Sequence, residues 1–309
     1  GGNIVWDKIQ LPEGSSDAEY VVTIQKGTDV EKFDAGVNTS LAFPDLDWGT
    51  GEYYIYIQAK SGVYLDNGEL VYQTISPYST TYTVIIQDSV SIIQSVDGLL
   101  SWGSISTAVG YNVKIVDASG HENVVYVTEA SFDMSDYAGF RTVSVMTKGN
   151  GENILDSDYS MPVHVITMPK VETIGLIDGK VTFDAVSIFN RAKLTFTSVD
   201  NSQLFYEFDC APSLFDGANN AKTWANIVET FGTDYTNWNY TNVFNTINNN
   251  YTLNKQINIP KGSYKLTIKL IGNTHAGSVD LAKGNIIVAS SQTSVAVEME
   301  KLGTPICHH

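Results

Sequence analysis

Residues 233–242 hold the side chains of this chain that are best suited to binding a ligand. The candidates are three aromatic rings and three amides: Tyr235, Trp238, Tyr240, Asn237, Asn239 and Asn242. Aromatic faces suit saccharides because sugars present apolar C–H faces, and amides can bond to the surrounding hydroxyls. The alternative is that the same rings cover a neighbouring helix and the end of a β-sandwich. The sequence leaves both interpretations open.

A short amphipathic helix is expected just before these residues, at 221–231. One face of it is apolar at positions i, i+3, i+4 and i+7: Trp224, Ile227, Val228 and Phe231. Asn219 and Asn220 are candidates for the N-cap, and Gly232 follows the last turn. The apolar face is expected to pack on a sheet, because an exposed stripe of that size is costly.

The other residues that bear chemistry form no catalytic motif. The sequence lacks the signatures of serine hydrolases, P-loops, dinucleotide-binding folds and zinc sites. Asp156 and Asp158 are carboxylates of the kind that calcium binds, but the remaining ligands of a calcium loop are missing, which favours a solvated turn. His121 and His164 are isolated and are expected to be structural. We therefore expect no enzyme, no metal site and no cofactor.

A strand pattern that occurs three times organises the chain around these residues. Residues 51–60, 139–148 and 262–270 each begin at a glycine and alternate in polarity with period two, as a half-buried strand requires. An aromatic residue with an aliphatic residue three positions later precedes each copy, at Trp6, Trp102 and Phe183. An internal repeat accounts for this recurrence. We expect each of these three aromatic residues, the aromatic anchors of the repeat, to be buried against the strand of Tyr20, Tyr111 or Leu194.

The motifs resemble fibronectin type III-like and immunoglobulin-like modules of bacterial surface proteins. The resemblance rests on the strand of Trp102, the Ala-x-Tyr strand at Tyr111, and 139–151 followed by Asp-Ser-Asp-x-Ser at 156–160. It is best over 90–168 and weakest over 169–309. The resemblance implies a module rather than an activity, because such modules serve as spacers, adhesin stalks and accessory domains of polysaccharide-degrading enzymes.

The expected fold is therefore all-β, a tandem array of three immunoglobulin-like or fibronectin III-like β-sandwiches. The expected domains are 1–89, 90–168 and 169–309, and the third carries a helix-containing insertion at about 200–255. Residues 286–288 and 295–299 are expected to be the strands that close the third domain.

Composition narrows the choice of partners. The net charge is −16 and only two arginines occur, Arg141 and Arg191, so a polyanion such as nucleic acid would be repelled. No apolar run approaches the roughly 18 residues of a membrane helix, so no membrane insertion is expected. Cys210 and Cys307 are interpreted as unpaired thiols, with a disulfide between them as the alternative. No apolar seam recurs, so we expect a monomer.

These observations predict a non-catalytic structural or adhesive segment that is extracellular or lies on the bacterial cell surface. Its partner would be a cell-wall or host glycan or another surface protein. The alternative is a carbohydrate-binding module centred on 233–242, of the kind that is accessory to a polysaccharide-degrading enzyme. A chain with enzymatic activity would need a catalytic domain outside these residues.

Overall fold

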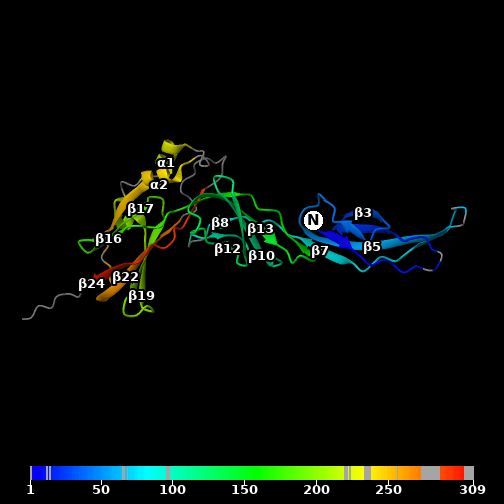
Figure 1. The fold of residues 1–309 in the computed structure, drawn as a ribbon, viewed down its shortest axis with the longest axis horizontal. Helices are drawn as coiled ribbons and strands as arrows, with labels where there is room; N and C mark the ends of the chain where they lie inside the picture. The colour runs from blue at the N-terminus through cyan, green and yellow to red at the C-terminus, as the bar shows by residue number, and fades with distance from the viewer. Residues whose placement is uncertain are drawn as a thin grey trace, which may run out of the picture. The chain divides into compact units, whose positions relative to one another are not determined.

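The computed structural model describes residues 2–11, 13, 15–64, 67, 69–94, 98–218, 222, 224–232, 238–255, 257–272 and 286–302 (Figure 1). Nearly all regular structure within these ranges is β-strand. The chain forms two compact units. Unit 1 comprises 1–89, 105–109 and 147–158, and unit 2 comprises 90–104, 110–146 and 159–309.

Unit 1 is built from one large sheet and one small one. Its strands are β1 (Asn3–Val5), β2 (Glu19–Lys26), β3 (Asp29–Gly36), β4 (Ser40–Ala42), β5 (Gly51–Tyr64), β6 (Leu70–Ile75), β7 (Tyr82–Ile86) and β14 (Ile154–Leu155). The large sheet has the order β14-β7-β5-β2-β3, with β6 also pairing with β5, and β1 pairs with β4 in the small sheet.

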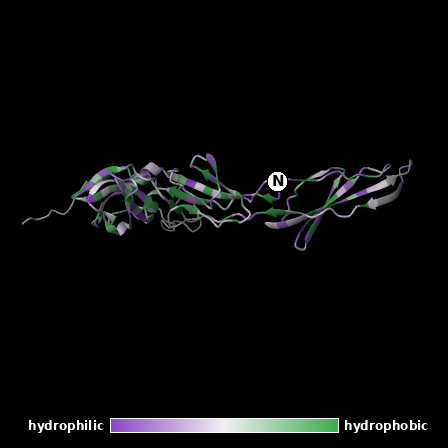
Figure 2. Cartoon of the chain, turned by 90° about the horizontal axis from the view of Figure 1, so that it is seen from below, coloured by the Kyte–Doolittle hydropathy of each residue, from purple (hydrophilic) through white to green (hydrophobic). Residues whose placement is uncertain are grey.

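Alternating side chains of β2 and β5 form the core of unit 1. Tyr20, Val22 and Ile24 from β2 and Tyr53 and Ile55 from β5 are all at most 2% exposed. Apolar residues of the small sheet pack against this cluster, so the two sheets form a sandwich. Figure 2 shows the corresponding changes between hydrophobic and hydrophilic residues along the strands.

Unit 2 contains four sheets and the helices of the chain's described residues. Its elements are β8 (Ile93–Gln94), β9 (Leu100–Ser101), β10 (Gly110–Val116), β11 (Glu122–Val127), β12 (Ser131–Phe132), β13 (Gly139–Lys148, whose last two residues belong to unit 1), β15 (Val163–Thr167), β16 (Ile174–Ile177), β17 (Lys180–Val186), β18 (Arg191–Ser198), β19 (Phe205–Cys210), a 3-10 helix (Pro212–Leu214), β20 (Phe215–Asp216), α1 (Trp224–Phe231), α2 (Tyr240–Ile247), β21 (Asn248–Leu253), β22 (Gly262–Ile271), β23 (Ile286–Ala289) and β24 (Val297–Lys301). The sheet orders are β11-β10-β13-β15-β23, β12-β9-β8, β16-β17-β21-β20 and β19-β18-β22-β24.

The last two of these sheets face each other across one core. Val181 and Phe183 from β17 join Leu194 and Phe196 from β18 in a single buried cluster, and each is at most 1% exposed. The predicted fold class is therefore confirmed: the chain is an all-β array of sandwiches, and its last part carries a short helical insertion.

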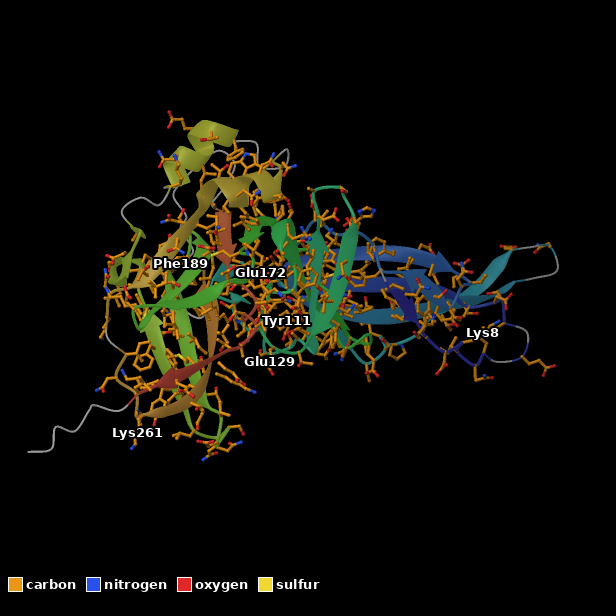
Figure 3. All side chains as sticks on the ribbon, turned by 60° about the vertical axis from the view of Figure 1, so that its left-hand side comes forward. Lys8, Tyr111, Glu129, Glu172, Phe189 and Lys261 are labelled. Atoms are coloured by element: carbon orange, nitrogen blue, oxygen red, sulfur yellow. The ribbon has the colours of Figure 1, made fainter. Side chains whose placement is uncertain are left out.

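Two of the three aromatic residues are buried as the repeat predicts, since Trp102 is 5% and Phe183 1% exposed, whereas Trp6 is only half-buried. Trp6 meets Tyr20 edge to face with ring centroids 5.6 Å apart, and Trp102 meets Tyr111 in the same way at 5.3 Å. Phe183 lies in the same buried cluster as Leu194, as expected, and its ring also contacts those of Phe189, Phe215 and Tyr251. Figure 3 labels Tyr111 and Phe189 among the side chains of unit 2.

One hydrogen-bonding arrangement recurs after each of the long strands β5, β13 and β22. Two serines three positions apart follow the strand, and each hydroxyl accepts a backbone N–H of that strand. In the last copy, Ser291 Oγ accepts from Leu270 at 3.0 Å and Ser294 Oγ accepts from Ile268 at 2.9 Å. The equivalent pairs in the other copies are Ser76–Ala59, Ser79–Ile57, Ser157–Thr147 and Ser160–Val145. The structure thus repeats in the same places as the sequence, the divergent third copy included.

Residues 286–289 join a different sheet from the one expected. The sequence favours 286–288 as a closing strand of the third domain, whereas β23 pairs in parallel with β15, where Val165 lies opposite Ile287. That prediction was wrong because a short, uniformly apolar strand carries no signal for the edge that it joins. The other expected closing strand is confirmed, since β24 pairs with β22.

Candidate functional site

The insertion that carries the predicted ligand-binding residues contains two short helices. The predicted helix is present as α1, although its expected N-cap residues Asn219 and Asn220 lie outside the described residues. Gly232 follows α1 with φ of +79°, a left-handed conformation that glycine adopts without strain and that commonly ends a helix. Ile227 is 1% exposed, and Val228 and Phe231 are partly buried against the same core, so these three residues pack inward as expected.

Trp238 lies inside the protein. Its side chain is 6% exposed, and its indole Nε1 donates to the Phe231 carbonyl oxygen at 3.0 Å. Its ring also contacts the rings of Phe231 and Tyr240, with centroid separations of 6.0 and 6.5 Å. As placed, Trp238 joins α1 to α2 and presents no open face on which a sugar could stack.

Tyr240 lies against the sheet that contains β13. Its ring stacks on Phe140, with centroids 5.9 Å apart and planes inclined by 9°. Burial raises the pKa of Tyr240 well above its ordinary value of 10.0, while the nearby charge of Arg141 acts in the opposite direction. The phenol therefore stays protonated at physiological pH.

The amides of this segment serve the local backbone. The Asn239 side chain accepts a hydrogen bond from the Asn242 N–H at 3.0 Å and so caps the N-terminus of α2. The Asn242 side chain is exposed. Tyr235 and Asn237 lie outside the described residues, so the saccharide interpretation of the whole segment stays a prediction.

The second helix, α2, is the element of this site that the sequence reasoning missed. Its signal was present: Tyr240, Val243, Phe244 and Ile247 have the spacing of one helix face, and Asn239 stands at the N-cap. Val243 and Ile247 are at most 1% exposed. The density of aromatic and Asn residues suggested a ligand platform instead, because the same residue types suit both purposes.

Asp156 and the two isolated histidines take part in turns and sheet packing, and the turn of His121 also contains Asp117. Asp156 accepts from the Gly149 N–H at 2.8 Å and forms an ion pair with Lys148. Asp117 accepts from the backbone N–H groups of His121 and Ser119, and these bonds lower the pKa of its carboxyl. His164 stacks on Phe140 with centroids 5.4 Å apart. Within the described ranges, no group of three His, Cys, Asp or Glu side chains is placed to hold a metal ion.

Cys210 is a free thiol at the end of β19. It is 4% exposed, and burial raises the pKa of the thiol above its ordinary value. Cys307 lies outside the described residues. A buried neutral thiol in this setting behaves as a small apolar side chain.

None of the helices that the structure describes is long and apolar enough to span a bilayer.

No family model and no curated protein matches this chain. Among solved structures, the FN1–FN3 domains of chicken CNTN1 match with 10% sequence identity, a TM-score of 0.25, and coverage of 97% of both chains. The tetra-tandem repeat in the extending region of a large adhesion protein matches with 11% identity and a TM-score of 0.21, over 93% of this chain and 68% of that one. Similarity at these TM-scores carries no argument, and the fold class rests on the sheets and cores described above.

Proposed function

We propose that this chain is a non-catalytic structural segment of an extracellular or cell-surface protein, in which packed β-sandwiches form a stiff spacer for adhesion. The observation that carries the proposal is the pairing of β23 with β15. It places a strand from near the end of the described chain in the sheet of the second repeat, so that sequence-distant parts of unit 2 are held together by backbone hydrogen bonds.

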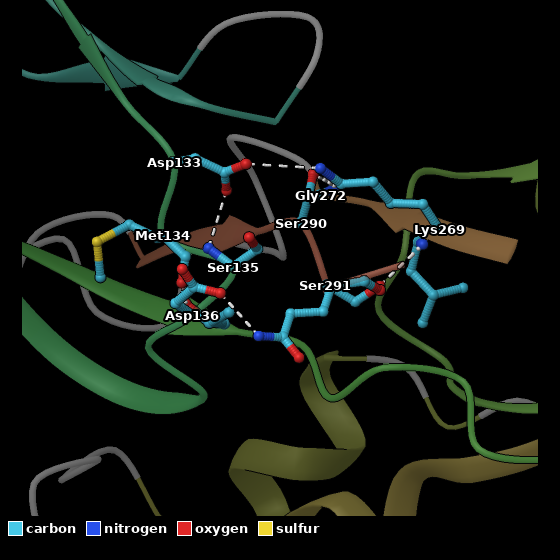
Figure 4. Close-up of polar contacts among 11 residues, drawn as sticks. Asp133, Met134, Ser135, Asp136, Lys269, Gly272, Ser290 and Ser291 are labelled. Carbon is cyan, nitrogen blue, oxygen red and sulfur yellow. Dashed lines mark hydrogen bonds and ion pairs between the residues drawn. The ribbon is translucent and has the colours of Figure 1, made fainter. Parts of the chain in front are cut away.

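Side chains reinforce this connection around β22 and β23 (Figure 4). Lys269 Nζ lies 3.6 Å from Asp133 Oδ2, and Gln292 Nε2 donates to Asp136 Oδ1 at 2.7 Å. The Met168 N–H also donates to the Ala289 carbonyl oxygen at 3.2 Å. Exposed ion pairs contribute little individually, so these contacts fix the geometry more than they add stability.

Buried apolar side chains stabilise this connection more than the polar contacts do. Ile286 and Val288 belong to the same buried cluster as Phe140 and Ile166 from the five-stranded sheet and the core of the last sandwich. Burying an Ile or Val side chain stabilises a fold by roughly 1.5–3 kcal/mol. A shared core and a shared sheet edge make separate unfolding of the two repeats unfavourable, which suits a segment that must keep its shape under load.

The charge of the chain fits the same role. A net charge of −16 keeps a protein soluble and discourages self-association at high local density. Because Trp238 is buried and Asn239 caps α2, no observation favours carbohydrate binding as a second candidate function.

Pulling single molecules by their ends tests the proposal. We expect unit 2 to extend in one step that releases its full contour length, about 3.5 Å per residue. Ile286→Ala should lower the force of that step or divide it in two, whereas Val295→Ala, at a position 70% exposed, should leave it unchanged. Separate unfolding of the second and third repeats in the wild-type protein would show that they bear load independently.

A further inference from the structure

Unit 1 has a groove beside the small sheet, with a volume of about 480 Å³. Its lining includes apolar side chains from both sheets of the sandwich, among them Ile4 of β1, Ile55 of β5 and Val84 of β7. Ile55 and Val84 are 2% and 5% exposed and belong to the core of the unit. The groove therefore gives access from solvent to the edge of the hydrophobic core.

One edge of β1 is available beside this groove. The Trp6 N–H donates to Thr39 and the Gly2 carbonyl accepts from Phe43, which places the backbone polar groups of residues 2, 4 and 6 toward β4. In an antiparallel pair the intervening residues direct their N–H and C=O groups to the opposite side. Those residues are Asn3 and Val5, and in the described part of the chain β1 pairs with β4 alone.

Two further features concern hydrogen bonding and charge. Trp6 lines the groove, and its buried indole N–H has no hydrogen-bond partner among the described residues. Asp7 and Glu152 also line the groove, both are exposed, and the lining contains no Lys or Arg. The groove is therefore apolar at its base, rich in unused backbone groups along one side, and acidic.

We propose that this groove binds an extended peptide segment of a partner protein, which adds as a strand to the free edge of β1. Alternate apolar side chains of the peptide would cover Ile4 and Val84, and a Lys or Arg would lie beside Asp7 and Glu152. Main-chain bonds to Asn3 and Val5 give such strand addition its affinity, and the pockets and charges give it specificity. The proposal goes beyond the structural role of unit 2, because it gives unit 1 a partner.

The probe is a capped eight-residue peptide that alternates Val and Thr and carries Lys at both ends. Its controls are the same peptide with Glu in place of Lys, and one N-methylated at alternate residues so that one edge cannot form hydrogen bonds. We expect the Lys peptide to shift the amide resonances of Asn3 and Val5 and the indole resonance of Trp6 in a saturable way. Both control peptides should bind at least about tenfold more weakly at low salt.

Two matched variants test the geometry. Val5→Pro removes an N–H that points away from β4, so it should abolish peptide binding, whereas Val5→Thr keeps that N–H and should bind within about twofold of wild type. If Val5→Pro destabilises unit 1, the N-methylated peptide still tests the same hydrogen bonds on the wild-type protein.

Three outcomes would overturn the proposal. The first is that the Lys peptide shifts none of the three resonances at millimolar concentration. The second is that the N-methylated peptide binds as tightly as the Lys peptide. The third is that Val5→Pro folds and binds the Lys peptide as tightly as Val5→Thr does. Concentration-dependent protection of the same amides without peptide would instead assign the groove to a second copy of this chain. None of these results bears on the single-step extension of unit 2, so the two proposals fail independently.

Discussion

The ring of Tyr240 is stacked on the ring of Phe140, with centroids 5.9 Å apart and planes inclined by 9°. This contact joins the first residue of α2 to β13, about one hundred residues earlier in the chain. It fixes the position of the insertion through packing, in the segment where the sequence most strongly suggests a ligand.

Tyr240→Ala should therefore destabilise unit 2 by about 2 kcal/mol, because a half-buried aromatic ring and its stacking partner lose contact. Tyr240→Phe preserves the ring and should cost much less. Chemical denaturation of the full chain measures the loss of stability in both variants. Equal midpoints for the two variants would show that the stacking contributes nothing.

The cap of α2 gives a second prediction. Asn239→Ala should cost about 1 kcal/mol, because the Asn242 N–H loses its side-chain acceptor. Asn239→Asp should retain most of the stability, since a carboxylate accepts the same bond. Asn242→Ala is the matched control, because the donor at that position is a backbone group. A larger loss for Asn242→Ala than for Asn239→Ala would contradict the capping role.

The repeated serine arrangement gives a third prediction. Ser160 Oγ accepts from the buried Val145 N–H at 3.0 Å, so Ser160→Ala leaves that donor without its side-chain acceptor. We expect a loss of roughly 1–3 kcal/mol in thermal or denaturant unfolding. Met161→Ala, at a neighbouring position 86% exposed, should have almost no effect. Comparable effects from both substitutions would mean that the hydroxyl has no special role.

Two substitutions of Trp102 separate the contribution of ring packing to stability from that of the indole N–H. It is 5% exposed, and its indole nitrogen is buried with no partner in the described residues. Trp102→Ala should cost roughly 3–5 kcal/mol. Trp102→Phe should cost far less, because it keeps a ring against Tyr111 and removes an unsatisfied donor. The prediction fails if the two variants have the same melting temperature.

His164 should make stability depend on pH. Burial lowers its pKa below the ordinary value of 6.5, so between the folded and unfolded pKa values the unfolded chain binds the proton more readily. The stability associated with neutral His164 is thus fully present above about pH 6.5 and falls as the pH drops below it.

Comparing His164→Asn with wild type at several pH values isolates this effect from the titration of carboxylates. The difference in unfolding free energy between the two proteins should change by no more than about 1.4 kcal/mol per pH unit. A difference that is constant from pH 5 to pH 8 would exclude a role for His164.

The sequence by itself determined the features that depend on local pattern. Period-two alternation located β5, β13 and β22, because successive side chains of a strand point to opposite faces. The spacing of apolar residues located α1, and the Trp102 and Tyr111 pair marked facing parts of one core. The same local logic could have located α2, whose N-cap and apolar spacing are both readable.

Only the tertiary structure decided which edge each short strand joins and what covers each ring. The four residues of β23 are apolar on both faces, so nothing in them distinguishes the edge at β15 from an edge in the last sandwich. Residues 154–155 likewise pair with β7 of unit 1, although they follow β13 in the chain. Such choices depend on which buried surface remains uncovered after the longer strands have paired. Trp238 shows the same limit, because a Trp beside three Asn residues is equally suited to a sugar and to a core, and only its packing against Phe231 placed it inside.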